Sequence, residues 1–233
     1  MHLKILYEDN HLLAVFKPAG SLVQGDKTGD VPIIEEAKSF IKQKYEKPGA
    51  VFIGLCHRLD RPVSGVLLLA RTSKALSRIN HLFATGQVKK EYLAISTSTP
   101  PLPQGVVDHW LRKDRKSNRV KYFERAISKS KKAVTAYKLL QRNGSHYLLG
   151  IEPATGRSHQ IRVALQSIGC SILGDVKYDG QRQADQRSIA LHCAALEFVH
   201  PVKKIPIRVA ANPPDALPWK FFSNFTIAAS DMS

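Results

Sequence analysis

Hydrophobic positions along the chain form short runs separated by turn-forming residues. The unbroken run from Val66 to Ala70 predicts a strand that is buried on both faces. The pair Asn143-Gly144 between two strand-like runs predicts a β-hairpin. The remaining runs rich in strand-forming residues predict strands near 3–7, 12–16, 51–55, 89–95, 133–141, 146–152, 189–196 and 205–210.

Three other segments repeat their apolar residues at helical spacing. The first spans about 32–45, with Asp30 as a cap-like residue and Pro32 in the first turn. The second runs from about 73 to Gly86, and the third spans about 159–168. Many short strands with about three helices, and no regular alternation, predict an α+β fold with a mixed, largely antiparallel sheet and flanking helices. With no repeat or linker-like segment, we expect residues 1–233 to form a single domain.

The charge balance is strongly basic. The chain holds 35 Lys and Arg against 19 Asp and Glu, a formal net charge of +16. Such an excess favours a polyanionic partner, with nucleic acid first and an anionic membrane surface second, although a merely solvated basic surface stays open. Ten of the basic residues lie between Arg112 and Lys132, with Tyr122 and Phe123 among them. This run predicts a phosphate-contacting arm or hairpin.

Cysteine usage and the chain start favour a cytoplasmic protein. The three cysteines are widely spaced and predict no disulfide framework. The first residues are too short and too interrupted for a signal peptide, and no apolar run is long enough to span a bilayer. The neighbours Cys56-His57 and His192-Cys193 lack the spacing of a zinc site, and nucleotide-binding motifs are absent. These residues are therefore better explained as small core or surface residues than as a metal site.

A compact charged segment, His57-Arg58-Leu59-Asp60, precedes the buried strand. A nearby arginine keeps a carboxylate ionised, and an ionised carboxylate can act as a nucleophile, a base or an electrostatic stabiliser. A structural ion pair between Arg58 and Asp60 is the alternative, and this segment alone favours it.

Several segments, in order, resemble the motifs of one family. The segment 57–60 with Ser64-Gly65 resembles the signature of the RluA family of RNA pseudouridine synthases. The segments 17–20 (KPAG), 90–94 (KEYLA) and 156–162 (GRSHQIR) resemble further motifs of that family. Gly174-Asp175 with Tyr178, and the segment 191–198, follow in the expected order. The resemblance runs from about residue 5 to 209, and small departures such as Val63 and Ser158 leave the charged and aromatic residues intact.

The resemblance implies that the protein isomerises uridine in ribosomal or transfer RNA to pseudouridine, without metal or organic cofactor. It implies a central RNA-binding cleft in which Asp60 is the catalytic aspartate, Tyr92 lies against the uracil and Arg162 pairs with Asp60. Arg58 would fill the gap left by the flipped base. Leu191 could line the uracil pocket, although a core leucine is the simpler interpretation. Arg157 and His159 could contact RNA phosphate or cap the following helix. Further candidate RNA contacts are Arg112, Lys113, Arg115, Lys116, Arg119 and Lys121.

Two alternatives stay open. A non-catalytic RNA-binding or RNA-folding module could keep the same fold, but it would not need Asp60, Tyr92 and Arg162 together. A metal-dependent hydrolase would require sensitivity to chelators. We expect a monomer with RNA as partner, no membrane association, no obligate protein partner and no additional N-terminal RNA-binding domain.

Overall fold

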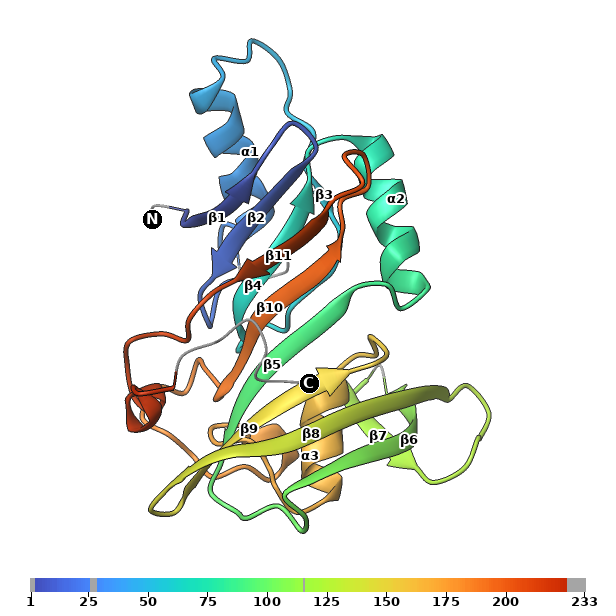
Figure 1. Cartoon of the computed structure of the whole chain (residues 1–233), viewed down its shortest axis with the longest axis vertical. Coiled ribbons are helices and arrows are strands. Elements are labelled where there is room, and N and C mark those ends of the chain that lie inside the picture. The colour runs from blue at the N-terminus through green and yellow to red at the C-terminus, as the bar shows by residue number, and fades with distance from the viewer. Residues whose placement is uncertain (1–2, 26–28, 115, 226–233) are drawn as a thin grey trace. The chain divides into compact units, whose positions relative to one another are not determined.

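The computed structural model describes residues 3–25, 29–114 and 116–225 (Figure 1). The candidate Arg115 lies outside these residues. The chain divides into two compact units, residues 1–88 with 195–211 and residues 89–194 with 212–233. Whether both units form the single catalytic domain expected over residues 1–233 stays a prediction. No helix in the described ranges is long and apolar enough to cross a membrane.

The strands of the first unit pair antiparallel. The strand β4 (Ser64–Ala70) is buried along its whole length, as its sequence predicts. β4 pairs with β2 (Leu12–Lys17) and with the short β3 (Gly54–Leu55). β2 also pairs with β1 (Ile5–Glu8). β11 (Pro206–Ala210) pairs with β10 (Leu191–Val199), which begins in the second unit and ends in the first.

Two helices of the first unit lie close to their predicted positions. α1 (Ile33–Lys44) packs Ile33, Ala37 and Ile41 into one apolar cluster with residues of β2 and β4. Asp30 does not cap this helix, because Pro32 occupies the N-cap position and Asp30 forms an ion pair with Arg61 instead. α2 (Ser73–Ala84) begins after Thr72, whose side chain accepts a hydrogen bond from the Ala75 N–H at 3.1 Å.

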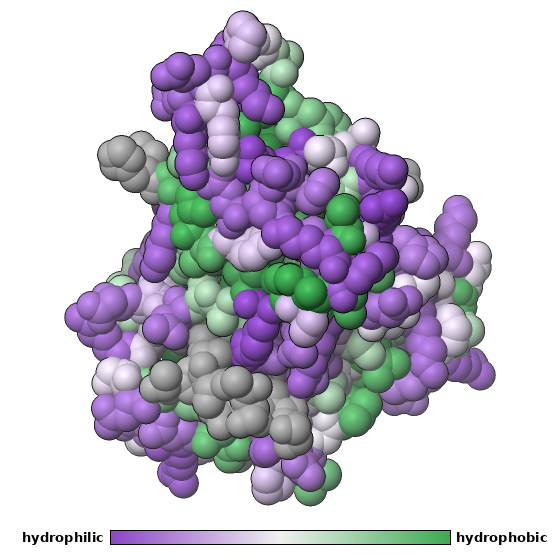
Figure 2. Space-filling model, turned by 45° about the horizontal axis from the view of Figure 1, so that its top comes forward, coloured by the Kyte–Doolittle hydropathy of each residue, from purple (hydrophilic) through white to green (hydrophobic). Residues whose placement is uncertain are grey.

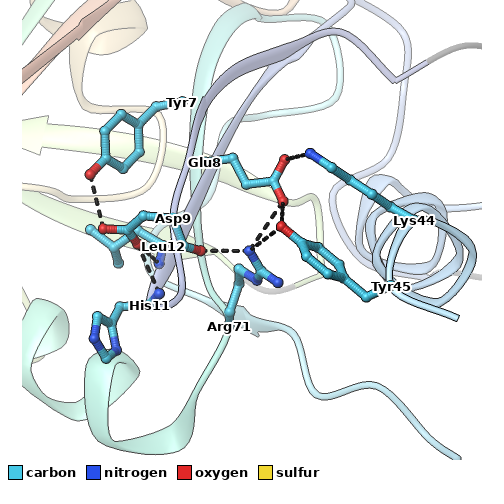
Figure 3. Close-up of polar contacts among 8 residues, drawn as sticks. All are labelled: Tyr7, Glu8, Asp9, His11, Leu12, Lys44, Tyr45 and Arg71. Carbon is cyan, nitrogen blue, oxygen red and sulfur yellow. Dashed lines mark hydrogen bonds and ion pairs between the residues drawn. The ribbon is translucent and has the colours of Figure 1, made fainter. Parts of the chain in front are cut away.

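Two neighbouring carboxylates, Glu8 and Asp9, make the polar contacts at the end of β1 (Figure 3). Asp9 Oδ1 accepts hydrogen bonds from the backbone N–H groups of His11 and Leu12, both at 2.8 Å. Burial alone would raise the pKa of Asp9, but these bonds and one from Lys203 hold it well below its usual range. Glu8 binds Lys44, Tyr45 and Arg71 and so ties the strand to the end of α1.

The second unit is built on an antiparallel sheet with strand order β5-β9-β8-β6-β7. Its strands are β5 (Lys89–Ser96), β6 (Gln104–Asp114), β7 (Arg119–Phe123), β8 (Lys131–Asn143) and β9 (His146–Pro153). α3 (Gln160–Ser167) covers one face of this sheet. Two short 3-10 helices, η1 (Val176–Tyr178) and η2 (Trp219–Phe222), complete the unit.

The predicted hairpins and the third helix are present. β8 and β9 are joined through Asn143-Gly144, with Asn143 opposite His146. The described residues of the basic run form the end of β6, all of β7 and the start of β8, so the run includes paired residues of the β6–β7 hairpin. Strand β6 itself is missing from the sequence prediction. Only Val107 and Leu111 of this strand are buried, so its alternation is weak. The α+β class with a largely antiparallel sheet is confirmed.

Candidate active site

Asp60 lies in the loop between β3 and β4, and a buried lysine fixes the chain around it. Lys17, at the end of β2, is 0% exposed. Its Nζ donates hydrogen bonds to the carbonyl oxygens of Pro18 at 3.0 Å, Arg61 at 3.0 Å and Val63 at 2.7 Å. Arg61 and Val63 lie one and three positions after Asp60, so Lys17 fixes the part of the loop that follows the carboxylate.

Opposing effects act on the charge of Lys17. Burial lowers its pKa to about 7, although the negative charge of Asp60 opposes this shift. The folded chain therefore releases the Lys17 proton at a lower pH than the unfolded chain, in which the lysine has its ordinary pKa of 10.5.

This difference predicts a pH dependence of stability. Between pH 7 and 10 the unfolded chain binds more protons than the folded chain, so the free energy of unfolding rises with pH. Relative to Lys17→Met, the wild type should gain up to about 1.4 kcal/mol per pH unit in this window. Urea unfolding of both proteins from pH 6 to 10 measures it, and a constant difference across that range would contradict the assignment.

His57 has a structural role in the same motif. Its Nε2 accepts a hydrogen bond from the Leu68 N–H of β4 at 3.0 Å, and its ring stacks on Phe83 at 5.2 Å. These contacts anchor the segment before Asp60 to a fully buried strand. Arg58, between His57 and Asp60, is exposed, while Asp60 is partly buried. These contacts, with those of the buried lysine, fix the backbone on both sides of Asp60, while the side chain of Arg58 remains exposed to solvent.

In the second unit, Arg162 of α3 forms a buried ion pair that the sequence did not predict. Its Nε and Nη2 bind Asp175 Oδ2 and Oδ1, both at 2.7 Å. The two residues are 6% and 1% exposed, and the ring of Tyr178 lies 5.0 Å from the guanidinium carbon. A bidentate pair of this kind fixes the plane of the guanidinium. The expected pairing of Arg162 with Asp60 stays a prediction.

Tyr178 extends this cluster to His159. Its hydroxyl oxygen lies 2.8 Å from the Val120 N, which donates to it, and 2.6 Å from His159 Nδ1. A hydrogen bond therefore joins the Tyr178 hydroxyl to His159 Nδ1. His159 has a φ of 52°, in the left-handed region, and its side chain does not cap α3.

The helix start is instead organised by Gln160. Its Oε1 accepts hydrogen bonds from Thr155 Oγ1 at 2.7 Å and from the Arg157 N–H at 2.9 Å. The side chain of Arg157 is exposed and donates to the Lys132 carbonyl oxygen at 3.0 Å. Arg157 and His159 therefore lie at one end of α3, with Arg162 one turn further along.

Comparisons with known proteins decide the family. The family model described as RNA pseudouridylate synthase matches residues 11–167. The chain belongs to this family. Its members are isomerases that convert uridine in RNA to pseudouridine, and the chain falls in its RluA branch.

Curated relatives and a solved structure agree with this family. The chain is 33% identical over 231 residues to ribosomal large subunit pseudouridine synthase C of Salmonella typhimurium, covering 91% of this chain and 67% of that one. It is 35% identical over 214 residues to an uncharacterized RNA pseudouridine synthase of Zymomonas mobilis, covering 91% and 94%. Human RNA pseudouridylate synthase domain containing 4 matches at 28% identity with a TM-score of 0.75, covering 91% and 89%. The expected pseudouridine synthase-like fold is confirmed.

The remaining candidates of this pseudouridine synthase lie on its second unit. Tyr92 is on β5 opposite Ile151 and is 9% exposed. Leu191, the first residue of β10, is 3% exposed, as expected for a core leucine. The described basic candidates of the β6–β7 hairpin are exposed, namely Arg112, Lys113, Lys116, Arg119 and Lys121. Hydrophilic side chains also cover much of the face drawn in Figure 2.

The supporting roles of two residues of the synthase, Lys17 and Asp175, were not predicted from the sequence. Both belong to segments that resemble family motifs, which was the available signal. Their partners are backbone carbonyls and a residue 13 positions away, and no local pattern reveals these. Within the described ranges, no group of three or more His, Cys, Asp or Glu could hold a metal ion.

Proposed function

We propose that this synthase isomerises uridine in structured ribosomal or transfer RNA, with Asp60 as its catalytic aspartate. The observation that carries the proposal is the Lys17 clamp on the loop that bears Asp60. A fully buried lysine is costly, and here all three of its described acceptors are backbone carbonyls of two motif segments. This arrangement supports a loop whose geometry matters for chemistry.

The reaction breaks the bond between uracil N1 and the ribose, turns the base, and joins the ribose to uracil C5. The proton on C5 must leave, and N1 must gain one. The carboxylate of Asp60 either attacks the sugar or assists elimination, and both routes need it ionised. Tyr92 is our candidate for moving the C5 proton, as the family resemblance implies.

Arg162 and Arg58 have different proposed tasks. Asp175 holds two nitrogens of the Arg162 guanidinium, and that fixed orientation supports its proposed role of binding and aiming Asp60. Arg58 is exposed, which supports its proposed insertion into the RNA stack in place of the flipped uridine. Arg157, His159 and the basic β6–β7 hairpin are proposed to contact RNA phosphates.

The test is modification of RNA that lacks the product. Purified protein is incubated with total RNA from cells without this gene, and pseudouridines are mapped as carbodiimide adducts that stop reverse transcription. We expect at least one new site, formed equally with and without a chelator. If no site appears although the protein binds the RNA, the chain is a non-catalytic RNA-binding module. Loss of product on chelation would instead favour a metal-dependent enzyme.

A further inference from the structure

The outer face of strands β6, β7 and β8 carries aromatic side chains, to which no role has been given, beside basic residues proposed above to contact RNA phosphates. Trp110 of β6 is directly opposite Phe123 of β7 and Lys132 of β8. Directly opposite residues of antiparallel strands point to the same face, so these three side chains form one row across the sheet. The next row on this face holds Arg112 opposite Lys121.

The other face of the same strands is covered. Leu111, Val120 and Ala133 pack with Val163 of α3 and with Tyr178 in one buried cluster. Figure 1 shows α3 behind β8 in that view. Because side chains alternate between faces along a strand, Trp110 and Arg112 point away from this cluster.

The side chains of this outer face suit nucleotides. Trp110 and Phe123 are only partly buried, and the guanidinium carbon of Arg112 lies 5.2 Å from the Phe123 ring centroid. Arg112, Lys121 and Lys132 are exposed beside them. Lys132 also forms an ion pair with Asp108 at 3.0 Å. Aromatic rings for base stacking beside cations for phosphates are the features of surfaces that bind single-stranded nucleic acid.

We propose that this face, defined as Trp110, Arg112, Lys121, Phe123 and Lys132 and named the stacking platform, binds an unpaired RNA segment that flanks the modified uridine. The inference rests on the proposed function, which supplies RNA as the partner. The cations of the platform match a phosphate chain, and the chain as a whole carries +16. A duplex keeps its bases stacked inside, so it cannot use the two rings.

The platform contains its own spectroscopic reporter. The chain has two tryptophans, Trp110 and Trp219, and Trp219 is 8% exposed in η2. In Trp219→Phe, emission comes from Trp110 alone. We expect a single-stranded oligouridylate to quench this emission with saturation, and a duplex of equal length at the same salt to leave it nearly unchanged.

Two variants assign the binding to the rings and to the charges. Phe123→Leu keeps an apolar side chain but loses the stacking ring, and should weaken oligouridylate binding by about 5-fold or more. Arg112→Gln should weaken it and lower its salt dependence. The matched controls are Phe52→Leu and Lys42→Gln on the first unit, both exposed, and they should bind as the wild type does. Circular dichroism checks that each variant is folded.

Three results would overturn the platform: no quenching of Trp110, equal quenching by duplex, or unchanged binding by folded Phe123→Leu. These results are separable from failure of the proposed function. Pseudouridine formation by the wild type without quenching removes only the platform. Quenching that depends on Phe123, without any pseudouridine formed, removes only the enzymatic assignment.

Discussion

Replacing Asp60 with asparagine should lower the rate of pseudouridine formation by about 10³-fold or more, while RNA affinity changes little. Asparagine keeps the size of the side chain but has no charge, so it can neither attack nor accept a proton. Lys17 donates hydrogen bonds to the main-chain carbonyls of Arg61 and Val63, and the substitution leaves these bonds in place. The measurement is single-turnover conversion of uridine to pseudouridine in an RNA that contains the target site. RNA binding is measured separately by filter retention.

The matched control is Asp215→Asn, because the side chain of Asp215 is 93% exposed. It should retain full activity. If Asp60→Asn converted RNA within about 10-fold of the wild-type rate, Asp60 would not be the catalytic aspartate.

Replacing Asp175 with asparagine should destabilise the protein by about 3–5 kcal/mol, because it removes the negative charge of a buried ion pair with Arg162. Urea unfolding at neutral pH measures this loss. The guanidinium would also lose the carboxylate that fixes its plane, so the rate of pseudouridine formation should fall under conditions where the variant is still folded.

A double variant separates stability from function. In Arg162→Met with Asp175→Leu, apolar side chains replace both charges, and such replacements are often neutral or stabilising. We expect stability near that of the wild type but no turnover. A double variant with wild-type activity would show that the ion pair serves stability alone, and a stable Asp175→Asn would contradict the buried pair itself.

Much of the fold could be predicted from local pattern. Local sequence alone predicts three of its features: the apolar run of β4, the apolar stripe of α1 and the Asn143-Gly144 turn. Each segment forms the structure that its own residues favour. Strand β6 could not be predicted in this way, because charged residues occupy most of its exposed positions and only two of its side chains are buried. Its pairing with β8 supplies the order that its own alternation does not.

In the candidate site too, residues within local motifs could be predicted, whereas tertiary contacts could not. Asp60, Tyr92 and Arg162 could be named because each lies in a segment with a recognisable motif. The support around them could not, since a lysine that binds three carbonyls and an arginine that binds Asp175 depend on tertiary approach. The aromatic row of Trp110 and Phe123 likewise needs the register of three strands.

The most direct test of the account is release of the uracil C5 hydrogen. RNA made with tritium at C5 of uridine loses that tritium to water when the ribose is joined to C5. We predict that the wild type releases one tritium per pseudouridine mapped, and that Asp60→Asn releases almost none while it still binds the RNA. Equal release by the two proteins, or none by a wild type that binds the RNA, would contradict the account.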